Sequence, residues 1–345
     1  MKNLYISLLL FIIISSSAQC PVGNVTLSSQ AEVNAFAVNF PNCTQITGNL
    51  YVTGSGITDL TPLSQINSVS GELAVYFSPS IERLNGLNGI TSVGTISLGG
   101  NAILNDISAL SNLTTVSNTL SVSNCPQLTS LNGLQGITAT GGLVSLKGLG
   151  VTDLTGLNNL ASIGFFLDIS YNPLLTSLNG LNNLTSIGAY LQMLNNPLLI
   201  DLTGIANINP LSITALVIRN CTSLSYCSVA SICYFVQNIS GGTMTNNLPG
   251  CNNGTEISNV CNLGTEDLNA GKFAVMPNPT TDFLYITASD NAQATNFIVS
   301  DLSGKIILDA QNRDNKIDVS HLSNGLYILS IIGDRATSKI KFVKK

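Results

Sequence analysis

The sequence predicts a mainly β protein, in which a solenoid of about eight short coils is followed by a small Ig-like β-sandwich. Three observations support this prediction. Apolar residues recur every 23 to 25 residues through the middle of the chain, and such self-similarity is typical of stacked repeats. Six of the eight cysteines flank the repeats, which indicates disulfide-bonded caps. Nine of the thirteen Lys and Arg residues lie between 272 and 345, so a different domain begins there.

Residues 1–18 have the pattern of a secretory signal peptide. Lys2 is followed by an apolar run from 4 to 14 and by small residues up to Ala18, which is the order of the three regions of such a signal. We predict cleavage near Ala18, so the mature chain enters an oxidising compartment. A lipid anchor on the next cysteine is disfavoured, because Gln19 stands where a lipoprotein signal needs Gly or Ala. No other segment predicts a membrane span.

Residues 19–43 are predicted to form an N-terminal cap. Ser29 and Glu32 have the spacing of a capping box, so we expect a short helix from about 30 to 38. A cap is needed because the first coil of a solenoid would otherwise expose one apolar face. The disulfide predicted to hold this cap joins Cys20 and Cys43.

Residues 44–225 are predicted to form the solenoid. Each coil begins with two apolar residues separated by one position, as in Leu167 and Ile169, and this alternation predicts a short, half-buried strand. Further apolar residues recur at fixed places in each coil, so every coil has an inward face that it can bury only against its neighbours. The coils begin at Leu50, Leu73, Ile96, Leu120, Val144, Leu167, Leu191 and Leu216.

A second set of equivalent residues, five positions after each start, is here called the Asn/Cys column. Most members are small polar residues or cysteines, and buried Asn side chains there would hydrogen-bond to the backbone of adjacent coils. We interpret the two cysteines as buried free thiols; the alternative is a long-range disulfide between them. The column comprises Ser55, Ser78, Asn101, Cys125, Leu149, Asn172, Asn196 and Cys221.

Residues 167–175, Leu-Asp-Ile-Ser-Tyr-Asn-Pro-Leu-Leu, resemble the leucine-rich repeat in their order of apolar residues, Asn and Leu. The next stretch, 178–188, is more similar to the receptor L-domain variety found in surface proteins of Bacteroidetes. The resemblance covers residues 44 to about 225. It implies a leucine-rich solenoid with the form of either an open horseshoe or a straighter β-helix.

Residues 226–261 are predicted to cap the other end of the solenoid. The segment 227–236 has apolar residues at helical spacing, which predicts a helix. Four cysteines in this region can form two disulfides, and the sequence leaves three pairings open. They are Cys227, Cys233, Cys251 and Cys261.

Residues 262–271 are interpreted as a linker, and residues 272–345 as strands separated by turns. This pattern predicts the small β-sandwich. Ser303-Gly304 and Ser323-Asn324-Gly325 are predicted hairpin turns. The predicted strands are 283–287, 297–300, 305–308, 326–330 and 339–343.

Four motifs of this domain resemble, in the same order, the type A C-terminal sorting domain of the type IX secretion system. The resemblance implies that the protein crosses the inner membrane with its signal peptide and the outer membrane with this domain, through contact with the type IX machinery. The expected location is secreted or on the outer cell surface. An ordinary Ig-like adhesion module is the alternative. The motifs are Met276-Pro277-Asn278-Pro279-Thr280, 301–305, 322–327 and the basic segment 339–345.

The composition argues against catalysis, cofactors and nucleic acid. The one histidine, His321, lies in the last domain, so a Ser-His-Asp or Cys-His system would have no base in the solenoid. No Cys/His spacing typical of zinc occurs outside the predicted disulfides. The formal charge is −5 and the pI is about 4.7, so the basic footprint of a nucleic-acid-binding protein is absent. We therefore predict no metal and no cofactor.

A series of carboxylates is the one feature that points to chemistry. Its members recur every 47 or 48 residues, two coils apart, so neighbours would be about 9.6 Å apart, near the upper limit for an inverting glycosidase. Because all four settings are equivalent, we favour turn capping, in which each Asp accepts nearby backbone N–H groups. The series comprises Asp59, Asp106, Asp153 and Asp201.

Outward-facing residues of the opening strands are predicted to form an exposed binding face. Small residues in its middle and aromatic residues near one end would admit a glycan or a protein segment. We predict a non-catalytic binding or adhesion protein; the alternatives are a polysaccharide-acting β-solenoid enzyme that uses paired Asp residues and a structural component of a surface layer. The candidate binding residues are Tyr51, Tyr76, Phe77, Lys147, Asp168, Tyr171, Gln192 and Arg219.

Overall fold

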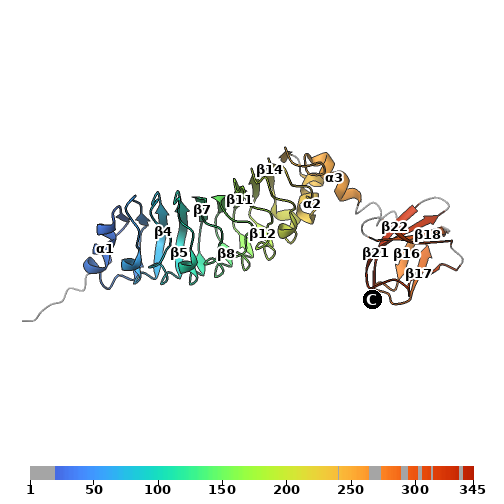
Figure 1. Cartoon of the computed structure of the whole chain (residues 1–345), viewed down its shortest axis with the longest axis horizontal. Coiled ribbons are helices and arrows are strands. Elements are labelled where there is room, and N and C mark those ends of the chain that lie inside the picture. The colour runs from blue at the N-terminus through green and yellow to red at the C-terminus, as the bar shows by residue number, and fades with distance from the viewer. Residues whose placement is uncertain are drawn as a thin grey trace, which may run out of the picture. The chain divides into compact units, whose positions relative to one another are not determined.

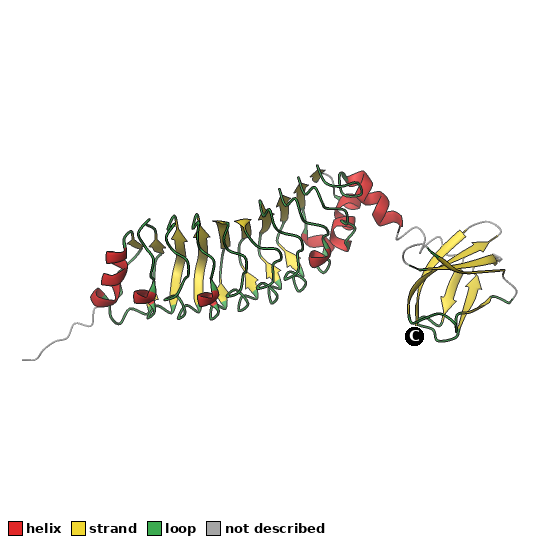
Figure 2. Ribbon diagram, viewed as in Figure 1, coloured by secondary structure: helices red, strands yellow, loops and turns green. Residues whose placement is uncertain are grey.

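The computed structural model describes residues 20–239, 241–263, 273–288, 294–301, 305–311, 314–333 and 337–345. The chain divides into two compact units, Met1–Ser258 and Asn259–Lys345, here called unit 1 and unit 2. The predicted signal peptide and residues 264–271 of the predicted linker lie outside the described residues. Strands dominate both units and helices are few (Figure 2).

Unit 1 is a stack of coils joined by a parallel sheet of fifteen strands. The predicted coil starts pair with one another without a break: Leu50 lies opposite Leu73, Leu73 opposite Ile96, and the series continues to Leu191 opposite Leu216. Figure 1 shows these strands side by side from β4 to β14, with α1 at one end of unit 1 and α2 at the other. The interval between repeats therefore sets the register of the sheet.

Seven of the eight predicted coils contribute to the sheet twice, so the strands form two rows. The long row consists of β1 (Val25–Leu27), β3 (Leu50–Val52), β4 (Ser68–Tyr76), β5 (Ser92–Gly99), β7 (Leu120–Cys125), β9 (Val144–Leu149), β11 (Phe166–Ser170), β13 (Tyr190–Leu194), β14 (Ala215–Arg219) and β15 (Thr243–Thr245). The short row consists of β2 (Gln45–Ile46), β6 (Thr115–Val116), β8 (Ala139–Thr140), β10 (Ser162–Ile163) and β12 (Ser186–Ile187), together with the first residues of β4 and β5.

The core of unit 1 consists of the recurring apolar positions. Leu84, Leu131 and Leu178 occupy one such position in alternate coils, and each is fully buried. Burial of one leucine side chain contributes about 1.5–3 kcal/mol, and no coil can achieve it alone because the contacts come from its neighbours. The repeated leucines therefore stabilise the stack as a whole.

The helix predicted for the N-terminal cap is present as α1 (Gln30–Asn39). Ser29 Oγ accepts a hydrogen bond from the N–H of Glu32 at 3.3 Å, and Glu32 Oε2 accepts one from the N–H of Ser28 at 2.6 Å. The glutamate thus reaches one residue beyond the usual capping-box partner. The remaining helices are α2 (Ala230–Asn238), α3 (Gly254–Leu263) and the 3₁₀ turns η1 (Thr61–Leu63), η2 (Ser108–Leu110), η3 (Thr203–Ile205) and η4 (Pro210–Ser212).

Unit 2 contains a β-sandwich of two antiparallel sheets. Phe297, Leu329 and Ile331 are buried in the core between them. One sheet has the order β16 (Phe273–Met276), β17 (Phe283–Ala288), β20 (Lys316–Asp318), and the other β19 (Ile306–Gln311), β18 (Ala294–Ser300), β21 (Gly325–Gly333), β22 (Thr337–Lys344).

The five strands predicted for this unit are all present, whereas β16 and β20 were not predicted. The turn at Ser303-Gly304 lies outside the described residues. The hairpin predicted at Ser323-Asn324-Gly325 is wrong, because β20 pairs with β17 while β21 pairs with β18 and β22. That turn carries the chain from one sheet to the other.

Candidate binding surface

The outward side chains of the long row form one continuous surface, here called the sheet face. The strand register arranges them in lines that run across the coils. In one line Tyr51 lies opposite Ala74, which lies opposite Ser97. In a second line Tyr76 lies opposite Gly99, and Lys147 lies two coils beyond Gly99. Neighbouring parallel strands are about 4.8 Å apart, so residues in one line are close neighbours.

Three of the predicted binding residues form a cluster at the N-terminal end of the sheet face. The ring centroids of Tyr51 and Tyr76 are 6.2 Å apart, and those of Tyr76 and Phe77 are 5.5 Å apart, both edge to face. The hydroxyl oxygen of Tyr51 accepts a hydrogen bond from Asn49 Nδ2 at 2.7 Å. Asn49 was not predicted as a site residue, although its position two residues before Tyr51 on the same strand face would have indicated it.

Phe77 has a backbone conformation that few side chains adopt. Its φ is +49° and its side chain is 70% exposed. The equivalent residue of each following coil also has a positive φ, and we call this set the left-handed column. Only Tyr171, with φ +60° and 55% exposure, shares the bulk of Phe77. The column comprises Phe77, Gly100, Asn124, Gly148, Tyr171, Asn195, Asn220 and Asn246.

A second cluster joins three more of the predicted residues, and its centre is buried. Asp168 was predicted to be exposed, but it is 1% exposed. Its carboxylate forms an ion pair with Lys147 Nζ and accepts hydrogen bonds from Gln192 Nε2, at 3.1 Å, and from Ser170 Oγ. Lys147 remains 39% exposed. The carboxylate is buried because its partners on the neighbouring strands cover it.

Two aromatic residues missed by the sequence reasoning support this cluster. Tyr190 donates its hydroxyl hydrogen to Gln192 Oε1 at 3.1 Å. Its ring stacks on that of Phe166 with centroids 4.6 Å apart. The paired strands β11 and β13 place these rings opposite each other, so the repeat alignment alone would have revealed the contact.

Arg219 is exposed and stands apart from both clusters. Its Nε donates a hydrogen bond to Thr245 Oγ1 at 3.2 Å, across β14 and β15. The strand register therefore gathers six of the eight predicted residues into two groups, and it leaves Tyr171 and Arg219 outside them.

The buried asparagines of the Asn/Cys column each tie their coil to the one before it. Asn101 Oδ1 accepts a hydrogen bond from the N–H of Ser78 at 3.0 Å, and its Nδ2 donates to the carbonyl of Val75 at 2.8 Å. Asn172 and Asn196 form the equivalent pairs with the coils before them. The expected role of these asparagines is thus confirmed. Ser55, assigned to the column from the sequence, is exposed and does not belong to it.

The cysteines of the column are free and those of the caps are bonded. Cys125 and Cys221 are buried thiols, as predicted, and burial raises the pKa of both despite hydrogen bonds that favour the thiolate. The predicted bond between Cys20 and Cys43 is present. In the C-terminal cap Cys227 pairs with Cys251, and Cys233 and Cys261 are disulfide-bonded as well.

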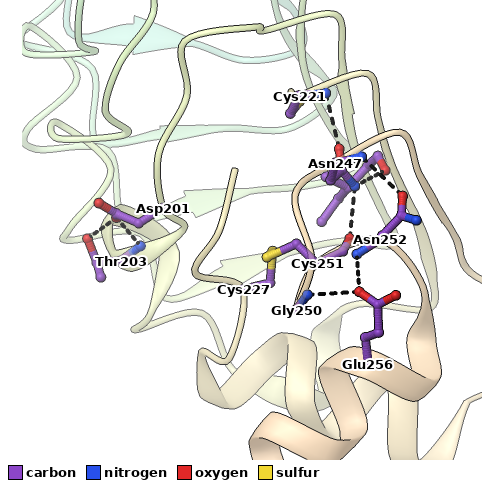
Figure 3. The surroundings of a disulfide bond; sticks show 10 residues. Asp201, Thr203, Cys221, Cys227, Asn247, Gly250, Cys251, Asn252 and Glu256 are labelled. Atoms are coloured by element: carbon purple, nitrogen blue, oxygen red, sulfur yellow. Dashed lines mark hydrogen bonds between the residues drawn. A yellow bond between two sulfur atoms is a disulfide. The ribbon is translucent and has the colours of Figure 1, made fainter. Parts of the chain in front are cut away.

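Asn247 continues the column into the C-terminal cap. Its Oδ1 accepts a hydrogen bond from the N–H of Cys221 at 3.1 Å, and its Nδ2 donates to the carbonyl of Cys251 at 2.9 Å. Figure 3 shows this side chain between the two segments. Beside it, Glu256 Oε2 accepts hydrogen bonds from the N–H groups of Gly250 and Asn252 at 2.8 and 3.2 Å. These contacts close the last coil, and they were not predicted from the repeat.

The four equivalent aspartates each bind their own turn, as the capping prediction expected. The carboxylates of Asp59, Asp106, Asp153 and Asp201 accept the backbone N–H two residues ahead at 2.8 to 2.9 Å. The hydroxyl of Ser108, followed by its N–H, lowers the pKa of Asp106. Each of the four carboxylates thus binds the Ser or Thr two residues ahead in its own turn.

Within the described residues, no group of three or more His, Cys, Asp or Glu side chains has a metal-binding arrangement. Among the same residues, no helix is long and apolar enough to span a membrane. His321 is exposed in unit 2. Its charge is one of the lesser causes of the lowered pKa of Asp318, after the hydroxyl and N–H of Ser320.

In unit 2, the motif at 276–280 fastens the edge strand β22. Asn278 Nδ2 donates to the carbonyl of Lys341 at 2.9 Å, and Asn278 Oδ1 accepts from the N–H of Val343 at 2.9 Å. Thr280 continues the pairing, since its N–H donates to the carbonyl of Val343 and its carbonyl accepts from the N–H of Lys345. Two motifs that are far apart in the sequence therefore form one edge of the sandwich.

Comparison with known proteins bears on unit 2. No curated protein matches the chain. Residues 274–345 match the family described as the secretion system C-terminal sorting domain, in agreement with the motifs at 276–280 and 339–345. The chain thus carries a C-terminal sorting domain of the type IX secretion system, which implies export to the cell surface or beyond.

Proposed function

We propose that this protein is a non-catalytic binding protein whose unit 1 is a leucine-rich-repeat solenoid and whose sorting domain delivers it to the cell exterior. The ligand, a glycan or a protein segment, binds to the sheet face. The resemblance of residues 44–225 to the leucine-rich repeat and the uninterrupted register of the coils support this assignment of the fold.

The observation that carries the proposal is the presence of Phe77 and Tyr171 in the left-handed column. The other six members are Gly or Asn, the residues that adopt a positive φ most easily. A bulky residue in this conformation costs about 1–3 kcal/mol, and both rings are more than half exposed, so little burial offsets the cost. Such strain at exposed positions is typical of binding sites.

The geometry of the aspartates supports the non-catalytic part of the proposal. A pair of carboxylates that acts as acid and base needs two different environments, which separate the two pKa values. Asp59, Asp106, Asp153 and Asp201 instead share the same contact, in which each accepts a hydrogen bond from the backbone N–H two residues ahead in its own turn. These carboxylates are engaged in capping.

The chain 19–345, tested on glycan and protein arrays, should bind at least one class of ligand. Phe77→Asn and Tyr171→Asn should both weaken that binding, because Asn fits the backbone but removes the ring. Tyr226→Ala, which removes an exposed ring outside the sheet face, is the control and should bind as the unaltered chain does. An empty result on both arrays would contradict the proposal. If the chain degrades a glycan, and Asp→Asn changes in the aspartate series abolish that degradation, the protein is an enzyme instead.

A further inference from the structure

The sheet face between the aromatic cluster and Lys147 is rich in hydroxyl groups and poor in charge. In the line of Tyr76, the next two positions are Gly99 and Ser123, and Lys147 follows. In the line of Ala74, the next two are Ser97 and Ser121. None of the residues before Lys147 in these two lines carries a charge; Glu72 lies in the next line out, at the margin of the area.

The hydroxyls of this area are available to a ligand. Among the described residues, the side chains of Ser97, Ser121 and Ser123 form no hydrogen bond within the chain, and neither does the hydroxyl of Tyr76. All four residues are partly exposed. Each hydroxyl can donate one hydrogen bond and accept others, so a bound molecule would find several uncharged donors and acceptors side by side.

The ring of Phe77 adds an apolar platform beside these hydroxyls. A Cβ placed on Gly100 of the next coil would lie 2.8 Å from Phe77 Cδ1, so the ring rests over the bare backbone of Gly100. The ring is nevertheless 70% exposed. It therefore has one side against the protein, and much of its surface faces solvent.

The backbone of this area cannot recognise a peptide by strand addition. β4, β5 and β7 are each paired on both sides, so their N–H and C=O groups are engaged in the sheet, whereas strand addition needs an open edge. A ligand must be held by side chains alone. An uncharged molecule with both hydroxyls and apolar C–H faces matches hydroxyls beside an open ring.

From this pattern, and resting on the proposed function, we propose that the area bounded by Tyr51, Tyr76, Phe77 and Lys147 binds a neutral polysaccharide. The polysaccharide runs across the coils. One of its sugars packs a face against Phe77, and hydroxyls along the polymer bond to Ser97, Ser121 and Ser123. From Tyr76 to Lys147 is three coil steps, or about 14 Å, which is long enough for several sugar units and too long for one.

Affinity electrophoresis of the chain 19–345 in gels that contain soluble starch, xyloglucan or galactomannan tests the proposal. At least one neutral polymer should retard the chain. Phe77→Asn and Tyr76→Ala should each weaken binding about tenfold, as expected for loss of an aromatic anchor. Binding should be insensitive to salt between about 0.05 and 0.5 M, since no ion pair is involved. Polygalacturonate, an acidic polymer, should bind less well.

A matched pair of glycine variants distinguishes the effect of displacing the Phe77 ring from the effect of backbone strain. Gly100→Ala places a methyl group against Phe77, whereas Gly148→Ala meets Asn124 Oδ1 at 3.1 Å. The two glycines have nearly the same φ, +66° and +62°, so the backbone strain is equal. Gly100→Ala should weaken polysaccharide binding several times more than Gly148→Ala does.

The possible failures are distinguishable. Neutral polysaccharide binding that survives Phe77→Asn, Tyr76→Ala and Gly100→Ala would overturn this site while the proposed function stands. A chain that binds only proteins on an array, or only the acidic polymer, would overturn the ligand class and leave a binding protein. A chain that binds no polysaccharide and no protein would overturn both.

Discussion

Asn196 holds the backbone of Asn172 in the preceding coil. Its Oδ1 accepts a hydrogen bond from the N–H of Asn172 at 3.0 Å, while its Nδ2 donates to the carbonyl of Ile169 at 2.8 Å. Both asparagines are fully buried. The side chain therefore provides hydrogen-bond partners for two backbone groups that water cannot reach. A buried polar group without a partner lowers stability by about 1–3 kcal/mol.

Asn196→Ala is expected to lower the free energy of unfolding of unit 1 by about 2–4 kcal/mol, because both backbone groups lose their partner. Urea denaturation followed by circular dichroism measures the change. Asn207→Ala is the matched control: Asn207 also bonds to the preceding coil, with Nδ2 to the carbonyl of Asn182 at 2.6 Å, but it is exposed. Asn207→Ala should lower the free energy of unfolding by less than about 1 kcal/mol. Equal losses would contradict the role assigned to the buried column.

Phe77→Asn is expected to raise the stability of unit 1 by about 1 kcal/mol, because Asn tolerates the positive φ better than Phe. The same change should weaken ligand binding. Thermal denaturation measures the change in stability. At Asn124, the equivalent position two coils on, the opposite change Asn124→Phe should lower stability by a similar amount. A destabilised Phe77→Asn chain would show that the ring contributes more by packing than it costs in strain.

Cys125 and Cys221 should resist alkylation by iodoacetamide in the folded chain at pH 8, because both are buried and have raised pKa values. In urea without reductant, mass spectrometry should find these two cysteines alkylated. Labelling of a cap cysteine would contradict the disulfide assignment. Labelling of the folded chain would contradict the burial of the column.

The same raised pKa values predict how stability depends on pH. Above the ordinary thiol pKa the unfolded chain releases protons that the folded chain retains, so stability is full below that pKa and falls as pH rises through it. Replacement of both Cys125 and Cys221 by Ala should flatten the decline between about pH 8 and 10. Parallel slopes for the two proteins in urea denaturation would contradict this origin.

Asn278→Ala should loosen β22 in unit 2, because the strand loses its bonds at Lys341 and Val343. Hydrogen exchange at the Val343 amide should accelerate by about tenfold or more. Asn278→Asp keeps the acceptor for Val343 and loses only the donor to Lys341, so its effect at that amide should be smaller. Unchanged exchange in Asn278→Ala would show that Thr280 and the pairing with β21 hold the edge without Asn278.

The repeat interval made most of unit 1 predictable. Once Leu50 and Leu73 are aligned, parallel pairing places every later start, and the buried asparagines follow because they stand at a fixed distance from those starts. The same rule fails at the first coil, where Ser55 is exposed. There the coil follows the cap rather than another full coil, so its path differs after the strand.

Contacts that depend on particular neighbours could not be predicted. Asp168 has the alternation of an outward residue, yet Lys147, Ser170 and Gln192 bury it. In unit 2 the turn at 323–325 has the composition of a hairpin, but the strand before it pairs in the other sheet. Local composition determines whether the chain turns, whereas the sandwich determines what pairs after the turn.

The alternation of turn types in unit 1 limits how such a protein can grow. Asp106 and Asp153 cap the turns of their coils, while in the intervening coil Ser130 Oγ accepts the N–H of Asn132 at 3.2 Å. Duplication or deletion of one coil would place two like turns next to each other. Insertion or deletion of two coils, 47 or 48 residues, preserves the order of the turns, so lengthening of the binding face should proceed in steps of two.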